Sequence, residues 1–209
     1  MRQETKDPNI LLVEAIPGGQ WAVRWDINPK LDENGNETGW YWYEEHVYNW
    51  IPTIEDIQLT ISDWFNKQTD DIIENGFEWN GIRVYLNDEN KFNYKAITDE
   101  ATRREQSIKL WDEENPELAG KDRHIVEVLI NGIMESASVI TGRPKSLLPV
   151  TLKLGKTNES KNFYVFNTLK ELQDFFSAGV DHLLNAYGMG WYKIATYDWN
   201  SYIEAINKL

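Results

Sequence analysis

The stretch FEWNGIRVYL, residues 77–86, carries the clearest local signal in the chain. Asn80-Gly81 lies between two runs rich in aromatic and β-branched residues, and Asn-Gly accepts positive φ at both central positions of a type I′ turn. The stretch therefore predicts a tight β-hairpin. Asn87-Asp88 follows as a helix-start signal, and apolar residues then recur at helical spacing to about residue 106. The whole segment is predicted to be a strand, turn, strand and helix unit.

A long amphipathic helix is predicted immediately before this hairpin. Pro52-Thr53 is a start signal and Asn75-Gly76 is an end signal. Between them, apolar residues fall on one stripe that must pack on a sheet. The stripe consists of Ile54, Ile57, Ile61, Trp64, Phe65 and Ile72.

The N-terminal part predicts an aromatic hairpin with a long polar loop. Alternating residues at 21–25 and at 40–43 indicate two strands that face each other across residues 32–39. Asp32, Asn34 and Asn36 occupy the first three ligand positions of an EF-hand loop, but Glu37 stands where that loop needs glycine and Tyr43 where it needs glutamate. An acidic turn is therefore expected instead of a calcium site.

The C-terminal part predicts two strands, at residues 150–154 and 163–166, followed by helices. Thr168 and Glu171 have the spacing of a capping box at the start of an amphipathic helix, which Gly188 is expected to end. Residues 191–197 are predicted to add an edge strand, and Asp198 to cap a terminal helix. Together these elements predict an α+β fold in which antiparallel hairpins pack against amphipathic helices.

The pattern is weak between residues 107 and 149, which we interpret as an insertion with a loop at 112–116 and a helix at 124–136. The predicted organisation is thus an N-terminal part at 1–106, this insertion, and a C-terminal part at 150–209. The first and last parts are expected to pack together as one domain.

Composition limits the classes of partner. The chain has 209 residues, of which 34 are acidic and 21 basic, so its formal net charge of −13 opposes binding to nucleic acid and to anionic lipid. The sequence holds no run of about 20 apolar residues that could span a bilayer. It has no cysteine, which excludes disulfides and thiolate chemistry, but it has ten tryptophans and ten tyrosines. We therefore expect neither nucleic acid nor membrane among its partners.

No pattern of residues indicates catalysis, a cofactor or a metal site. His46, His124 and His182 lie far apart, and none has a second ligand three or four residues away. Glu44 and Glu45 stand beside aromatic rings, as in glycosidases, but neighbouring residues of a strand point to opposite faces. We therefore predict a non-enzymatic protein with no catalytic, cofactor-binding or metal-binding residue.

The aromatic residues are the best candidates for binding. Trp21, Trp25, Trp40 and Trp42 are predicted to pack mainly in the core. Surface positions are predicted for Tyr41, Tyr43, Tyr48 and Trp50. Exposed rings of this kind stack on sugar faces or anchor a protein partner at the centre of an interface, so these four residues are the predicted partner-binding or glycan-binding site.

Residues 52–96 resemble an uncharacterised domain of proteins from gut Bacteroidales phages and prophages that is associated with tail and tail-fibre genes. The resemblance is carried by GFEWNG at 76–81 and ENKFNYKA at 89–96, and later by FNT at 166–168 and the helix that follows. Residues 107–149 depart from that pattern. The family supplies no established active-site residue to transfer to this chain.

The resemblance implies a phage structural or tail-associated protein that binds a larger virion or fibre component, in the virion or in the host bacterial cytoplasm. Other phage structural proteins are the expected partners, in a homo- or hetero-oligomer, because phage appendages are symmetric. Two alternatives stay open: a tail-fibre assembly chaperone, and a glycan-binding or glycan-processing protein acting at the bacterial surface.

Overall fold

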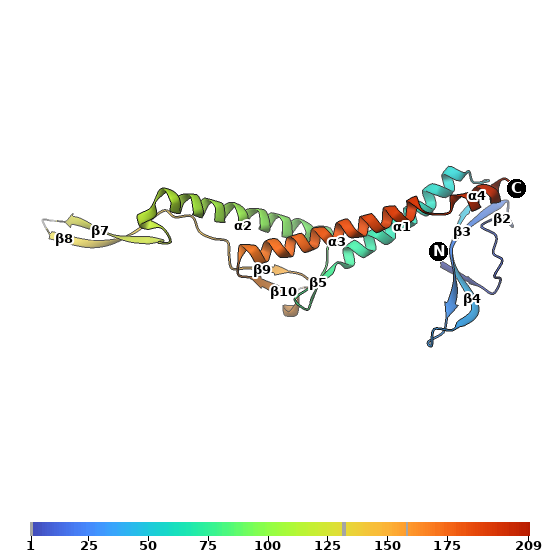
Figure 1. Cartoon of the computed structure of the whole chain (residues 1–209), viewed down its shortest axis with the longest axis horizontal. Helices are drawn as coiled ribbons and strands as arrows, with labels where there is room; N and C mark the ends of the chain where they lie inside the picture. Colours follow the sequence, from blue (N-terminus) through green and yellow to red (C-terminus); the bar gives the residue numbers. More distant parts are fainter. Residues whose placement is uncertain (1, 131–132, 158) are drawn as a thin grey trace. The chain divides into compact units, whose positions relative to one another are not determined.

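The structure, a computed structural model, describes residues 2–130, 133–157 and 159–209. It divides into two compact units, which are described separately: unit 1 comprises Met1–Asp70 and Tyr187–Leu209, and unit 2 comprises Asp71–Ala186 (Figure 1). The α+β class is confirmed, since antiparallel hairpins pack against amphipathic helices.

Unit 1 is built on a four-stranded antiparallel sheet with the order β1-β4-β3-β2. The long β3–β4 hairpin confirms the predicted aromatic hairpin, whereas β1 and β2 were not predicted. A bulge after Trp25 places Asp26 at φ 51° and shifts the register between Trp25 and Asn28. The four strands are β1 (Arg2–Thr5), β2 (Val13–Ile16), β3 (Gln20–Leu31) and β4 (Glu37–Tyr48).

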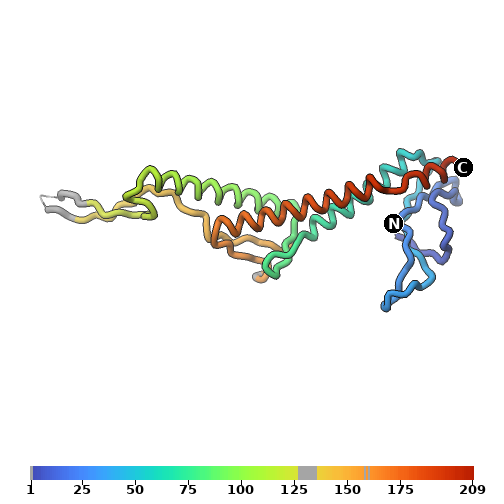
Figure 2. The backbone as a smooth tube through the Cα atoms, in the orientation of Figure 1, coloured from blue at the N-terminus to red at the C-terminus, as the bar shows by residue number. Residues whose placement is uncertain are grey.

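Helices α1 (Ile54–Asn75) and α4 (Trp199–Ile206) supply the other half of the core of unit 1. Both begin where the sequence predicts: Thr53 Oγ1 accepts from the backbone N–H of Asp56, and the Asp198 carboxylate accepts from that of Ser201. Five residues of the predicted apolar stripe of α1, from Ile54 to Phe65, pack in one cluster with Val23 and Trp25 of the sheet, whereas Ile72, the sixth, is exposed. Figure 2 follows the chain through these elements.

The tryptophans of the β3–β4 hairpin divide between core and surface. Trp25 is buried and meets Trp64 of α1 edge-on, with 6.2 Å between ring centroids. Trp21 and Trp42 are partly buried, but Trp40 is 38% exposed, so its predicted core position is wrong. Trp40 lies near the β3–β4 turn, and its ring contacts the Lys6 ammonium.

Unit 2 contains the predicted Asn-Gly hairpin, formed by β5 (Phe77–Trp79) and β6 (Ile82–Val84). Asn80 and Gly81 have φ values of 47° and 77°, as a type I′ turn requires. Helix α2 (Asp88–Glu114) begins as predicted, because the Asn87 side chain accepts from the backbone N–H of Asn90. The helix continues past residue 106 into the predicted loop at 112–116, and a short 3₁₀ turn, Pro116–Leu118, follows it.

The C-terminal elements of unit 2 are β9 (Val150–Lys153), a 3₁₀ turn (Ser160–Asn162), β10 (Phe163–Phe166) and helix α3 (Leu169–Ala195). The two strands pair antiparallel, as predicted. The capping spacing is confirmed, since Thr168 Oγ1 accepts from the backbone N–H of Glu171. The carboxylate of Glu171 in turn accepts from the backbone N–H of Asn167.

Helix α3 passes through Gly188, so the predicted helix end and the edge strand at 191–197 are both wrong. The reason is a close contact inside unit 1: a Cβ at Gly190 would clash with the side chain of Thr69 on α1. Gly190 therefore marks a point where the helix approaches its neighbour closely, whereas nothing lies within 4 Å of a Cβ built at Gly188 and the helix continues through it.

The predicted helix at residues 124–136 is also wrong, because β7 (Arg123–Ile130) and β8 (Ile133–Ile140) pair antiparallel there. β-Branched residues such as Ile125 and Val126 favour a strand, and Asn131-Gly132 lies between the two runs in the sequence. Residues 131 and 132 lie outside the described residues.

Candidate binding site

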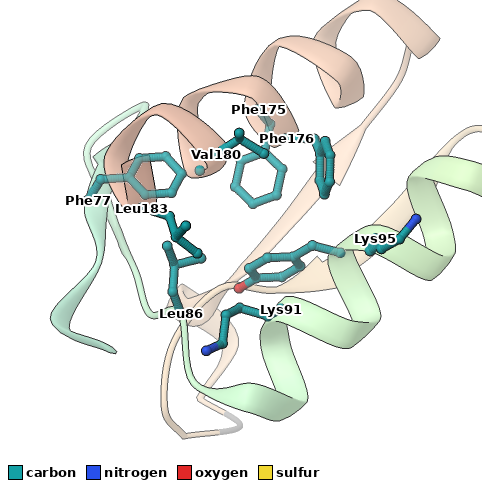
Figure 3. Close-up of a pocket in the computed structure, with 10 residues that line it drawn as sticks. Phe77, Leu86, Lys91, Lys95, Phe175, Phe176, Val180 and Leu183 are labelled. Carbon is teal, nitrogen blue, oxygen red and sulfur yellow. The ribbon is translucent and has the colours of Figure 1, made fainter. Parts of the chain in front are cut away.

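Unit 2 contains a pocket of about 170 Å³ between α2, α3 and the residues around the β5–β6 hairpin (Figure 3). We call it the α2–α3 pocket. Almost all of its wall is hydrocarbon. It is lined by Phe77, Leu86, Lys91, Tyr94, Lys95, Phe175, Phe176, Gly179, Val180 and Leu183.

The deep wall of the α2–α3 pocket is a cluster of rings centred on Phe175. The Phe175 ring lies 5.9 Å from that of Phe77, 5.0 Å from that of Tyr94 and 4.9 Å from that of Phe166. The Tyr94 hydroxyl donates to the carbonyl of Lys153 at 2.9 Å, and burial raises the pKa of Tyr94 well above its usual range. This hydroxyl is therefore protonated, has its acceptor, and is not poised for acid–base chemistry.

Charge is confined to the α2 side of this pocket. Lys91 and Lys95 stand about one helical turn apart on α2, and both line the pocket. Each ammonium pairs with an exposed carboxylate of the same helix, Lys91 with Asp88 at 2.9 Å and Lys95 with Asp99 at 2.6 Å. Such pairs contribute only about 0.3–0.5 kcal/mol, so both lysines can exchange their partner for another carboxylate.

Sequence reasoning missed this pocket. Phe175, Phe176, Val180 and Leu183 lie on the amphipathic helix predicted after Thr168, but their spacing does not show that they border a cavity. The lining residues at 77–95 and those at 175–183 are about 80 residues apart in the sequence, and their convergence depends on the packing of α2 beside α3. The only local signal was Gly179, a residue without a side chain within an apolar helix face.

Two of the predicted site residues, Tyr41 and Tyr43, lie on β4 and are partly buried. The Tyr43 ring stands 5.7 Å from the guanidinium of Arg24, which donates to the carboxylates of Glu14 and Glu45 at 2.6 and 2.7 Å. Beside these residues lies a polar cleft of about 450 Å³, the Tyr43 cleft. It is lined by Thr5, Asp7, Asn9, Ile10, Leu11, Glu14, Arg24 and Tyr43.

The third predicted residue, Tyr48, is only 5% exposed, and its predicted surface position is wrong. It ends β4 opposite Trp21, where its side chain packs into the core against α1. Its hydroxyl is hydrogen-bonded to Thr60 and donates to the carbonyl of Asp56 at 3.0 Å. Burial also raises the pKa of the Tyr48 hydroxyl.

The fourth residue, Trp50, is 56% exposed. Its Nε1–H donates to the Asp56 carboxylate at 3.3 Å, and its ring meets that of Tyr48 edge-on at 5.5 Å. Ile51 and Ile203 are also exposed, and they border an apolar groove of about 390 Å³. We call Trp50, Ile51 and Ile203 the Trp50 patch. The structure thus does not bring the four residues together in one surface site: Tyr41 and Tyr43 are partly buried on β4, Tyr48 is in the core, and Trp50 is exposed.

Three titratable residues named in the sequence analysis, His182, His46 and Asp32, contact other groups of the chain. His182 donates from Nε2 to the carbonyl of Ile72 at 3.1 Å, and His46 packs edge-on against Tyr48. Asp32 accepts the backbone N–H groups of Asn34 and Asn36, as expected for a turn. Across the described parts of the chain, no three His, Cys, Asp or Glu residues are grouped so that they could hold a metal ion.

Comparison with known proteins adds no assignment. The chain matches no protein-family model, no curated protein and no solved structure. Among the residues that the structure describes, no helix combines the length and the apolar character needed to cross a bilayer.

Proposed function

We propose that this chain is a non-enzymatic binding protein, a phage structural or tail-associated component that docks onto a larger virion or fibre protein through the Trp50 patch. The phage context is supported by the resemblance of residues 52–96 to the tail-associated domain. The binding role is supported by large apolar side chains, Trp50, Ile51 and Ile203, that remain exposed at the surface of unit 1.

The observation that carries the proposal is the exposure of Trp50 together with Ile51. Burying an exposed apolar side chain of this size is worth about 1.5–3 kcal/mol, and tryptophan is enriched among the residues that dominate interfaces. The orientation of the Trp50 ring is also restrained, because its Nε1–H donates to the Asp56 carboxylate and the ring meets that of Tyr48 edge-on. A preorganised ring loses little side-chain entropy on binding.

The test is incorporation into particles of the phage or prophage that encodes this chain. Mass spectrometry of purified virions should detect the native protein, and the double variant Trp50→Ser/Ile203→Ser should reduce its copy number at least about tenfold. Leu59→Ser is the matched control, since Leu59 is an exposed apolar residue of α1 outside the patch. Virions without the native chain would favour the assembly chaperone instead.

The glycan-binding alternative rests on the Tyr43 cleft, where an aromatic ring stands beside hydroxyl, amide and carboxylate groups. Sugars are recognised by such a combination of ring and hydrogen-bonding groups. A glycan array with the native protein and Tyr43→Ala tests this alternative. Specific hits that are lost in Tyr43→Ala would support it, and an array without hits would remove it.

A further inference from the structure

We propose that the α2–α3 pocket is a second docking site, which accepts one phenylalanine or leucine side chain from an acidic segment of a partner protein. The inference rests on the proposed binding function, but it uses a different surface, in unit 2 instead of unit 1. Three properties of the pocket carry it: its volume, its lack of free polar groups, and the sign of the charge at its rim.

The volume favours a single side chain. Pockets for cofactors and other large ligands usually enclose about 300–1,000 Å³, whereas a cavity of about 150 Å³ holds one benzene ring. The α2–α3 pocket, at about 170 Å³, is therefore the size of one ring or one branched aliphatic group. Such pockets receive the anchor residues of protein interfaces.

The chemistry of the wall also favours a protein partner over a free metabolite. A small ligand is oriented by a few polar groups inside its pocket. Here the Tyr94 hydroxyl is already bound to the Lys153 carbonyl, and the remaining lining apart from the two lysines is apolar or glycine. Selectivity must then come from outside the pocket, and the exposed side chains of Val180 and Leu184 extend the apolar surface along α3.

The charge at the rim of the pocket favours an acidic partner segment. In a chain with a net charge of −13, the pocket is flanked by two lysines on successive turns of α2. Their present carboxylate partners are exposed, so a partner's acidic residues can replace them at little cost. A basic or neutral segment would lack this interaction with the two ammonium groups.

A substitution at Gly179 can be used to fill the pocket. A Cβ built at Gly179 would lie 3.5 Å from the Phe77 ring, which is ordinary contact, so a small side chain fits while a leucine would occupy the space of the guest. Gly188 is on the same helix, and nothing lies within 4 Å of a Cβ built there. Gly179→Leu and Gly188→Leu therefore make the same change in helix propensity, and only the first fills the pocket.

The experiment titrates the full chain with blocked tripeptides, followed by NMR shifts of the backbone amides of Gly179 and Lys95. The probe acetyl-Glu-Phe-Asp-amide should bind at least about tenfold more tightly than acetyl-Glu-Ala-Asp-amide, because the ring is buried. It should bind about two- to fivefold more tightly than acetyl-Lys-Phe-Lys-amide, in line with exposed ion pairs. Gly179→Leu should abolish the binding that Gly188→Leu retains.

A second variant covers the case in which Gly179→Leu does not fold. Lys91→Glu/Lys95→Glu changes only the rim and should reverse the preference between the acidic and the lysine-flanked probe. Equal binding of the Phe and Ala probes, or an unchanged preference in the charge-reversed variant, would overturn the proposal. So would binding of 3-phenylpropionate as tight as that of the acidic peptide, which would assign the pocket to a small acid.

Failure of this inference is distinguishable from failure of the proposed function. If the peptides do not bind the pocket but virion incorporation depends on the Trp50 patch, only the proposal of a second docking site is overturned. If virions lack the chain but the peptides bind the pocket specifically, the proposed virion role is overturned and the proposed docking site stands.

Discussion

The β5–β6 and β7–β8 hairpins of unit 2 both have Asn-Gly between their strands in the sequence, yet they are stabilised in different ways. The strands of β5–β6 are three residues long, and its rings pack on Phe175: Phe77 at 5.9 Å and Trp79 at 5.5 Å. The strands of β7–β8 are eight residues long, but Ile125 and Ile140 are 74% and 71% exposed.

The attachment of β7–β8 to the rest of unit 2 is polar. Arg143 follows β8 and donates twice to the carboxylate of Asp112 on α2, at 2.7 and 2.8 Å. The backbone N–H of Thr141 donates to the carbonyl of Asp122 at 3.0 Å, which closes the base of the hairpin. The comparison shows that a turn dipeptide specifies a hairpin, while packing of its side chains decides whether that hairpin belongs to the core.

The largest expected effect is on the ring cluster under β5–β6. Phe175→Ala should lower the free energy of unfolding by about 3–5 kcal/mol, because it removes a buried ring and leaves a cavity. Ile125→Ala on β7 should change it by less than about 0.5 kcal/mol, because the side chain is exposed. Urea denaturation followed by circular dichroism measures both. Similar losses in the two variants would contradict the proposed difference between the hairpins.

Alanine substitution of one glycine beside each hairpin compares how tightly the backbone packs at β5–β6 and at β7–β8. Gly76 and Gly142 have φ values of 62° and 81°, and they lie next to β5 and just beyond β8. A Cβ at Gly76 would clash with the carbonyl oxygen of Val84, whereas nothing lies within 4 Å of one at Gly142. Gly76→Ala should therefore cost about 3 kcal/mol, from strain and displacement together.

Gly142→Ala should cost only the strain of the left-handed conformation, about 1 kcal/mol. Thermal unfolding of the two alanine variants under identical conditions provides the measurement. Equal shifts in melting temperature would mean that the close approach of Gly76 to β6 does not constrain the folded chain.

The smallest expected effect is a pH dependence of the stability of the β7–β8 hairpin alone. Hydrogen bonds from Arg143 hold the pKa of Asp112 below its usual value. Because the folded-state pKa is lowered, the stabilisation is complete above the unfolded pKa of about 3.9 and is lost as pH falls through the folded value. Hydrogen exchange at the Thr141 amide should accelerate over that range relative to the intrinsic rate, while exchange at β5–β6 should not.

In Asp112→Asn, the Thr141 amide should exchange faster than in the native protein already at neutral pH. Its exchange relative to the intrinsic rate should then no longer change as the pH is lowered. Asp99→Asn is the control, since Asp99 pairs with Lys95 within α2 and does not contact the hairpin base. An unchanged acid response in Asp112→Asn would assign the attachment of the hairpin to other groups.

Local interactions account for what could be predicted. The helix starts at Thr53, Asn87, Thr168 and Asp198 were recognised because each cap involves residues three positions apart. The Asn80-Gly81 turn was recognised because its φ values depend on those two residues alone. The prediction of a helix at 124–136 was a wrong choice between two periodicities, although Asn131-Gly132 in the sequence favoured the hairpin that is observed.

The amino-acid sequence by itself determined the α+β class, the helix starts and the tight turn of unit 2, since these depend on contacts between residues close together in the chain. Only the tertiary structure decided that Tyr48 is buried while Trp50 is exposed, that α3 passes through its glycines, and that residues of α2, α3 and the β5–β6 region enclose a pocket. Each of these depends on which distant segment packs opposite a side chain, and a pattern along one chain does not contain that information.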